Sequence, residues 1–176
     1  MSSSILWTFD DGPSQYTEPI LDLLDAHGVK GTFFIVGQKV EARPAAVRSI
    51  IARGHRVGNH SYSHPSLPQL TAADVHDELV ACTTAISGAG VPAPTLFRPP
   101  YGDTNDTVRR VAAELDLEQM LSDIDPQDWR SDSAQIINAV TAEARGGGVL
   151  LLHDGGGDRS ETVAALGTLL ERFADA

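Results

Sequence analysis

The stretch Ile5-Leu-Trp-Thr-Phe9, followed at once by Asp10-Asp-Gly-Pro13, sets the pattern from which the fold can be read. Five mainly apolar residues bounded by a turn sequence are typical of a buried strand. Similar runs recur along the chain, each bounded by Gly, Pro or Asp, and longer stretches with helical periodicity separate them. The strand candidates after Ile5–Phe9 are Thr32–Val36, His55–Asn59, Thr95–Phe97, Glu118–Asp123 and Gly148–Leu152.

The helical stretches carry terminal signals of their own. Pro44 suits a first helical position, and Thr71 with Asp74 resembles a capping box. Gly28 and Gly54 suit the C-terminal ends of helices. The alternation of strands and helices predicts βαβ units and a parallel sheet covered by helices. The helix candidates are Thr17–His27, Pro44–Arg53, Thr71–Ser87, Thr104–Leu115, Ser133–Arg145 and Glu161–Ala174.

The length limits the architecture. The chain has 176 residues without a linker, repeat or low-complexity tract, so we expect one α/β domain spanning residues 1–176. A closed eight-stranded (β/α) barrel typically needs ~250 residues. The length therefore favours a distorted or incomplete barrel, or else an open doubly wound sheet. Because the last predicted helix would normally lead into another strand, we expect a barrel to be incomplete at its C-terminal end.

Composition excludes several classes of function. Thirteen Lys and Arg residues against 24 Asp and Glu give a net charge of −11, which disfavours nucleic acids and anionic membrane surfaces as partners. Cys82 is the only cysteine, so an internal disulfide and a zinc site built from several cysteines are excluded. No apolar run reaches the ~18 residues of a membrane span. Met1–Ser4 leads into the first strand without a signal peptide, which fits a cytoplasmic protein or the mature part of an exported one.

Polar residues follow five of the six predicted strands. The clusters are Asp10-Asp11, Asn59-His60 with His64, Arg98–Gly102, Asp125–Trp129 and His153-Asp154. The C-terminal ends of parallel strands meet at one edge of the sheet, where α/β proteins assemble their sites. We therefore expect these clusters, which lie far apart in the sequence, to be neighbours in space.

Two of the clusters have the composition of a metal site. His60 and His64 are four residues apart, a spacing that lets both imidazoles face one cation. The adjacent carboxylates of Asp10 and Asp11 repel each other unless a cation lies between them. One carboxylate and two imidazoles leave coordination positions open for water and substrate, which is the pattern of a catalytic metal.

The other chemically versatile side chains are interpreted as structural. The remaining histidines lie in a predicted strand or on helix faces, the cysteine suits a small buried apolar position, and the aromatic side chains of the strands suit the core. These structural residues are His27, His55, His76, Cys82, Trp7, Phe9, Phe33 and Phe34.

Five segments together resemble a known family. In order and spacing they are similar to the five motifs of the polysaccharide deacetylases, the NodB homology domains of carbohydrate esterase family 4. The resemblance implies a distorted (β/α) barrel of seven or eight strands. It also implies metal-dependent removal of acetyl groups from N-acetylglucosamine polymers or from acetylated xylan. The segments are Thr8-Phe-Asp-Asp-Gly-Pro13, His60-Ser-Tyr-Ser-His64, Arg98-Pro-Pro-Tyr-Gly102, Asp125-Pro-Gln-Asp-Trp129 and Leu150-Leu-Leu-His-Asp154.

The resemblance assigns the metal and the base. It implies that Asp11, His60 and His64 bind one divalent metal ion, with Zn²⁺ as the first choice and Co²⁺ or Ni²⁺ as alternatives. Asp10 would be the general base, because a carboxylate that binds a cation is a weak proton acceptor. Arg98 would hold this base ionised and oriented.

The remaining roles follow from the later motifs. By resemblance, His153 is the general acid that protonates the leaving amine, and Asp128 raises its pKa. The backbone N–H of Tyr101 would stabilise the oxyanion. Trp129 and Leu151 would form the walls of a pocket for the acetyl methyl group.

Three other classes of function fit the sequence less well. A noncatalytic carbohydrate-binding domain would be expected to lose at least one of the predicted metal-binding or proton-transferring residues, and all are present. Gly155-Gly-Gly157 could hold a phosphate, but Asp154 and Asp158 oppose an anion there and no nucleotide-binding motif accompanies it. A hydrolase of small amides would need lid loops, whereas short connections favour an open groove for a polymer.

The sequence leaves the substrate open among acetylated polymers. We expect chitin or chitooligosaccharides, with acetylxylan or peptidoglycan as alternatives, and acetate as the product. The resemblance further implies a protein located outside the cell or at the cell wall, although the chain alone does not exclude the cytoplasm. We expect it to act as a monomer.

Overall fold

A computed structural model describes residues 5–174, without the side chain of Arg145. The expectation drawn from Met1–Ser4 lies outside the described residues. Six strands form one sheet in the order β5-β4-β3-β2-β1-β6, and all neighbouring pairs are parallel. The strands are β1 (Ile5–Gly12), β2 (Gly31–Ile35), β3 (Arg56–Asn59), β4 (Leu96–Phe97), β5 (Glu118–Gln119) and β6 (Gly148–His153).

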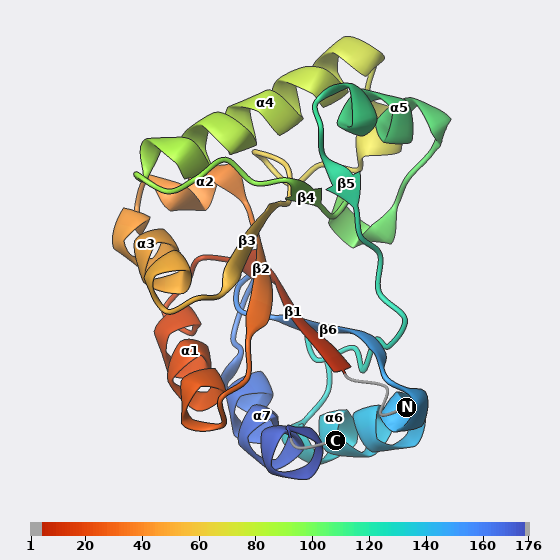
Figure 1. Ribbon diagram of the computed structural model, residues 1–176. Helices are drawn as coiled ribbons and strands as arrows, with labels where there is room; N and C mark the ends of the chain where they lie inside the picture. Colours follow the sequence, from red (N-terminus) through yellow and green to blue (C-terminus); the bar gives the residue numbers. More distant parts are fainter. Residues whose placement is uncertain (1–4, 175–176) are drawn as a thin grey trace.

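The sheet curls into part of a barrel with the helices outside it (Figure 1). The gap between β5 and β6 is crossed by the chain that follows β5 (Figure 1). There Ile124 forms a single parallel bridge with Leu150, and its carbonyl accepts a hydrogen bond of 2.9 Å from the N–H of Leu151. The prediction of a short, distorted and incomplete barrel is confirmed. The described residues contribute six strands, fewer than the seven or eight that the resemblance implies.

Seven α-helices accompany the strands in the described part of the chain. Their bounds agree with the predicted stretches to within two residues, apart from the short helix α2, which was not predicted. The predicted cap at Thr71 is present, because its Oγ1 accepts a hydrogen bond from the N–H of Asp74. No described helix is long and apolar enough to cross a membrane. The helices are α1 (Thr17–Ala26), α2 (Gly37–Val40), α3 (Pro44–Ala52), α4 (Ala72–Gly88), α5 (Asp106–Glu114), α6 (Ser133–Glu143) and α7 (Ser160–Phe173).

One predicted strand is much shorter than expected. The sequence predicted a strand over Glu118–Asp123, but β5 ends at Gln119. Past this point the chain crosses toward the other side of the sheet, where the N–H of Asp123 donates to the carbonyl of Val149 at 2.9 Å. This crossing carries the Asp125–Trp129 segment to the end of β6.

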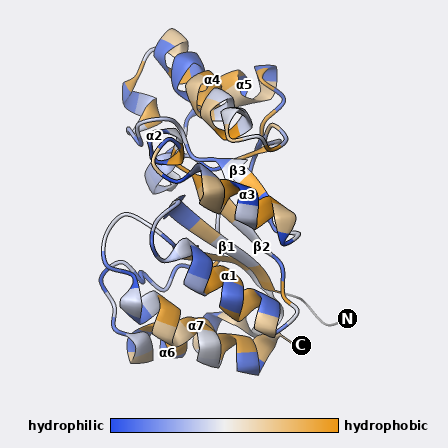
Figure 2. Ribbon diagram, turned by 90° about the vertical axis from the view of Figure 1, so that its left-hand side faces the viewer, coloured by the Kyte–Doolittle hydropathy of each residue, from blue (hydrophilic) through white to orange (hydrophobic). Residues whose placement is uncertain are grey.

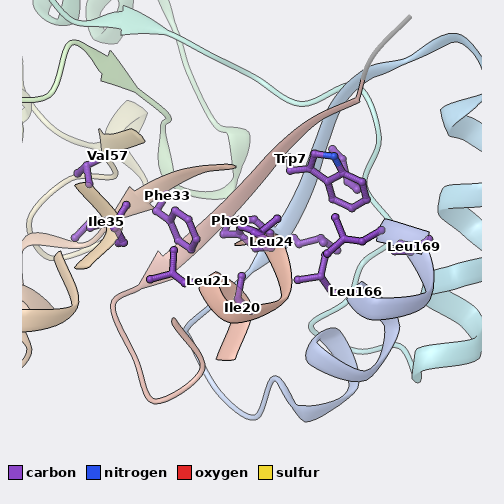
Figure 3. Close-up of a cluster of buried hydrophobic side chains, with 14 of the residues drawn as sticks. Trp7, Phe9, Ile20, Leu21, Leu24, Phe33, Ile35, Val57, Leu166 and Leu169 are labelled. Carbon is purple, nitrogen blue, oxygen red and sulfur yellow. The ribbon is translucent and has the colours of Figure 1, made fainter. Parts of the chain in front are cut away.

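The main core lies between the outer face of the sheet and the surrounding helices. Figure 3 shows side chains of β1 and β2 meeting those of α1 and α7 there. Phe9 and Phe33 stack with ring centroids 4.9 Å apart, as expected of aromatic residues in neighbouring strands. Hydrophilic and hydrophobic residues alternate along the helices (Figure 2), because only one side of each helix faces this core. Burial therefore fixes the strands, and with them the positions of their C-terminal ends.

Replacing a core leucine tests this packing. Leu166→Ala in α7 removes a fully buried side chain and should lower the free energy of unfolding by about 2–5 kcal/mol. Leu6→Ala in β1 is the matched control, because that side chain is 51% exposed and its loss should cost less than about 0.5 kcal/mol. Urea denaturation of both variants measures the difference. Equal losses would contradict the assignment of the core.

Candidate active site

The two adjacent aspartates face the same cavity because the backbone of β1 is irregular at Asp11. In a regular strand, neighbouring side chains point to opposite faces. Here the pairing with β2 skips one residue, since Asp10 lies opposite Phe34 and Gly12 lies opposite Ile35. Asp11 is the extra residue, and its φ of 70° turns its side chain toward that of Asp10. Both carboxylates consequently line one cavity.

Asp11 lies against the two histidines of the predicted metal site. Its Oδ1 is 3.0 Å from Nε2 of His64 and 3.4 Å from Nε2 of His60. One ligand atom from each of the three residues lies within 4.8 Å of the others. Nδ1 of His60 donates to the carbonyl of Arg98 at 2.7 Å, which leaves the lone pair on Nε2 and directs it toward Asp11.

This cluster fits a divalent cation. Oδ1 of Asp11 is buried and has no hydrogen-bond partner in the described part of the chain. Burial alone raises the pKa of Asp11, but the imidazoles of His60 and His64 outweigh it and hold that pKa well below its usual range. An ionised carboxylate oxygen facing two imidazole nitrogens is the donor set of a catalytic zinc site.

Asp10 has a different partner. Nη1 of Arg98 donates to Oδ1 of Asp10 at 2.9 Å, and both side chains are almost fully buried. The same nitrogen donates to Oγ1 of Thr8 at 2.7 Å, and the guanidinium lies 4.3 Å from the ring centroid of Phe34. These contacts fix the guanidinium, so the buried carboxylate of Asp10 has a fixed counter-charge.

His153 is paired with Asp128. Nδ1 of His153 donates to Oδ1 of Asp128 at 2.6 Å, and Oγ1 of Thr162 donates to the other carboxylate oxygen at 2.8 Å. Burial lowers the pKa of His153, but the Asp128 carboxylate outweighs it, and the net shift is upward. His153 therefore keeps its proton to a higher pH than an ordinary histidine does.

One cavity of about 660 Å³ unites the predicted site. All the predicted site residues line it except Asp128, which lies behind His153. Tyr101 and Trp129 are 75% and 53% exposed and stand at its rim, whereas Leu151 lies deeper, beside His153. The cavity is therefore open enough for part of a polymer to enter.

The sequence did not point to several residues of this site. Leu121 and Arg159 also line the cavity, and no motif singled them out. Asp154 is fully buried and accepts a hydrogen bond of 2.6 Å from Oγ1 of Thr17. Burial, with the nearby charges of Asp11 and Asp10, raises the pKa of Asp154 to about 7. The sequence had placed Asp154 with His153 among the polar clusters expected to meet at the strand ends, but had assigned it no role.

Comparisons with known proteins identify the family. The family model described as polysaccharide deacetylase matches residues 2–120. The chain belongs to the polysaccharide deacetylase family. The prediction of a hydrolase that removes acetyl groups from polysaccharides is confirmed at the level of the family.

Three relatives illustrate the similarity. A chitooligosaccharide deacetylase of Bradyrhizobium is 40% identical, over 92% of this chain and 76% of its own length. A peptidoglycan-N-acetylglucosamine deacetylase of Bacillus cereus is also 40% identical, over 93% of this chain and 78% of its own. The structure of a family 4 carbohydrate esterase from Streptomyces lividans, in complex with acetate, superposes with a TM-score of 0.90 at 38% identity. That match covers 98% of this chain and 88% of the esterase.

The pairing of His153 with Asp128 predicts a measurable titration. In Asp128→Asn the pKa of His153 should fall, because the carboxylate that stabilises the protonated ring is gone while burial still opposes its charge. NMR titration of the His153 ring measures the pKa. Asp132→Asn, at the N-cap of α6, is the control and should leave it unchanged. An unchanged pKa in Asp128→Asn would contradict the pairing.

Proposed function

We propose that this protein is a metal-dependent deacetylase of N-acetylglucosamine polymers, with chitooligosaccharides as the favoured substrate and acetate as a product. The observation that carries the proposal is the convergence of three elements in one cavity. These are the cluster of Asp11, His60 and His64, the buried carboxylate of Asp10, and the side chain of His153.

Asp11, His60 and His64 would hold the metal ion, with Zn²⁺ as the first choice and Co²⁺ or Ni²⁺ as alternatives. When bound, a divalent ion supplies Lewis-acid chemistry, which polarises nearby oxygen atoms and offsets negative charge that develops on them. The preference for zinc rests on the two imidazole ligands, which suit zinc better than magnesium or calcium.

Asp10 acts as the general base. Its carboxylate takes a proton from the water molecule whose oxygen attacks the acetamide carbonyl carbon. Nη1 of Arg98 donates to Oδ1 of this carboxylate at 2.9 Å and fixes its direction. Asp11 is unsuited to the same task because its Oδ1 faces His60 and His64.

His153 acts as the general acid. As the C–N bond breaks, Nε2 of His153 gives its proton to the sugar nitrogen, and acetate and the free amine leave. Asp128 supports this step because it keeps the ring protonated and binds Nδ1. The backbone N–H of Tyr101 donates to the oxyanion of the tetrahedral intermediate, and Trp129 and Leu151 enclose the acetyl methyl group.

Charge favours a neutral polymer as the substrate. Relatives that are equally similar to this chain are named for chitooligosaccharides and for peptidoglycan, so similarity alone does not separate these two. The chain carries a net charge of −11, and the exposed carboxylate of Asp125 stands at the cavity. An acidic protein repels an anionic polymer more than a neutral one. Chitooligosaccharides are neutral, whereas peptidoglycan carries carboxylates, and acetylxylan is the neutral alternative.

The setting of the protein follows from this substrate. We expect it to act outside the cell or at the cell wall, where such polymers occur. An acidic chain fits a partner that is neither a nucleic acid nor an anionic membrane. Nothing in the proposed mechanism requires a second copy of the chain, so we expect a monomer.

Substitutions should separate the proton-transferring residues from the metal ligands. Asp10→Asn and His153→Ala should each lower kcat by about 10²–10⁴-fold, because each removes one proton transfer, while both variants still bind metal. His64→Ala should lose the metal itself, because it removes one of three ligands. Acetate release and metal content measured on the same samples test this. Full activity of Asp10→Asn would remove the assignment of the base.

Parallel assays should identify the substrate and test the metal. Acetate release is measured from chitopentaose, acetylxylan and peptidoglycan, each before and after treatment with a chelator and again after Zn²⁺ is returned. We expect chitopentaose to give the highest kcat/KM, and we expect the chelator to abolish activity that zinc restores. A preference for peptidoglycan would refute the charge argument. Activity that persists in protein shown to contain no metal would refute the metal-dependent reaction.

A further inference from the structure

The carboxylate of Asp11 is confined on the side facing away from the histidines. Its Oδ1 faces His60 and His64, whereas its Oδ2 lies against the main chain of Gly156. A Cβ atom added to Gly156 would lie only 2.5 Å from Oδ2 of Asp11. Carbon and oxygen atoms that are not bonded rarely approach so closely, since favourable contacts begin at about 3.5 Å. Only a residue without a side chain leaves this carboxylate where it is.

The backbone of Asp11 is confined as well. A Cβ on Gly155 would lie 1.9 Å from the carbonyl oxygen of Asp11, so the two main chains are in direct contact. The same oxygen accepts a hydrogen bond of 2.5 Å from Nζ of Lys39, at the C-terminal end of α2. Asp11 is thus held on its carbonyl by Lys39 and Gly155 and on its carboxylate by Gly156.

The glycine segment itself is fixed to the rest of the protein. The N–H of Asp154 donates to the carbonyl of Asp10 at 3.0 Å, which continues the pairing of β6 with β1. On the other side, Nε of Arg159 donates to the carbonyl of Gly155 at 2.7 Å, and this guanidinium is almost fully buried. Both contacts hold the chain immediately before Gly156, so this residue cannot easily move away from Asp11.

We propose that Lys39, Gly155 and Gly156 form a clamp that positions Asp11 as a metal ligand, with the missing side chain of Gly156 setting the direction of the carboxylate. This inference rests on the metal assignment under the proposed function. It gives a role to the Gly155–Gly157 run, for which the sequence disfavoured phosphate binding. Gly155 and Gly156 leave room for Asp11. Gly156 and Lys39 are positioning residues, since neither offers a ligand atom to the cluster.

The size of the effect follows from the geometry. In Gly156→Ala the new methyl group must displace Oδ2 of Asp11, and the rigid carboxylate then turns Oδ1 away from the two imidazole nitrogens. Residues that orient a metal ligand without binding the metal typically contribute about 10- to 100-fold to affinity. Gly156→Ala should therefore weaken Zn²⁺ binding by about 10- to 100-fold, while the exposed position leaves the fold intact.

The experiment measures Zn²⁺ affinity by competition with a chromophoric chelator, together with the midpoint of thermal unfolding of the metal-free protein. Two matched controls separate the contact with Asp11 from the strain of a positive φ. Gly90→Ala has a φ of 89°, close to the 78° of Gly156, and meets no atom within 4 Å. Gly157→Ala lies in the same segment and meets only the Arg159 guanidinium, at 3.5 Å. We expect both controls to keep the affinity of the wild type.

Lys39→Met tests the contact of the clamp with the Asp11 carbonyl. For this variant, the clamp and the loss of charge predict opposite changes in Zn²⁺ affinity. Loss of a positive charge near a cation site should strengthen Zn²⁺ binding, whereas loss of the hydrogen bond to the Asp11 carbonyl should weaken it. The clamp predicts weaker binding, by about tenfold. If Gly156→Ala fails to fold, this variant still tests the part of the clamp that acts on the Asp11 carbonyl.

The outcomes distinguish failure of the clamp from failure of the metal assignment. If the wild type binds Zn²⁺ and Gly156→Ala binds it no more weakly than Gly90→Ala, the clamp is refuted while the metal site stands. Unchanged or stronger binding by Lys39→Met refutes the part of the clamp that acts on the carbonyl. A wild type that binds no divalent ion refutes the metal assignment, and the clamp with it.

Discussion

The site depends on one backbone irregularity, the extra residue at Asp11 near the end of β1. Two neighbouring carboxylates on a regular strand would lie on opposite faces of the sheet, one of them in the apolar core. The bulge brings Asp10 and Asp11 to the same cavity, where both lie near His60, but only Asp10 contacts Arg98 and only Asp11 contacts His64. Two chemically identical side chains thereby become suited to two tasks, one beside the Arg98 guanidinium and the other beside two imidazoles.

The buried carboxylates of the site have specific partners, which lower the free-energy cost of burying them. Burying an ionised carboxylate without a partner costs free energy, because the charge loses its hydration. Two such carboxylates close together cost more, because they also repel each other. Arg98 compensates Asp10, and Asp128 accepts a hydrogen bond from the His153 ring, whose pKa it raises. Oδ1 of Asp11 has no hydrogen-bond partner among the described residues, and it is the atom that faces both imidazoles. Of the two buried carboxylates that have an oxygen without a hydrogen-bond partner in the described part of the chain, Asp11 and Asp154, Asp11 is the one whose unpartnered oxygen faces two imidazoles and that a cation there would compensate.

Most of the fold and most of the site residues could be predicted from the sequence. The apolar runs determine the strands, and the ends of the strands determine where the polar side chains meet. The ends of β1 and β5 could not be predicted in this way, because they depend on contacts between residues far apart in the sequence. Asp10-Asp-Gly-Pro13 reads locally as a turn, yet β1 continues to Gly12 because β2 and β6 flank it on both sides. Glu118–Asp123 has the pattern of one strand, but the chain leaves β5 early and Asp123 instead bonds to Val149 of β6. Leu121 reaches the cavity only because of that path, so no local pattern could mark it.

Strained backbone is concentrated where the chemistry is proposed. Among the described residues, Asp11, His64 and Tyr101 all have φ between 62° and 70° without being glycine, and all three line the cavity. Such conformations cost roughly 1–3 kcal/mol each and persist only where surrounding contacts enforce them. At His64 the N–H donates to Oγ of Ser61 at 3.1 Å, and at Asp11 the enforcing contacts come from Lys39 and the glycine run. Asp11 and His64, two of the proposed metal ligands, are therefore held in place by the fold itself, so the proposed site would not draw the free energy of ordering them from metal binding.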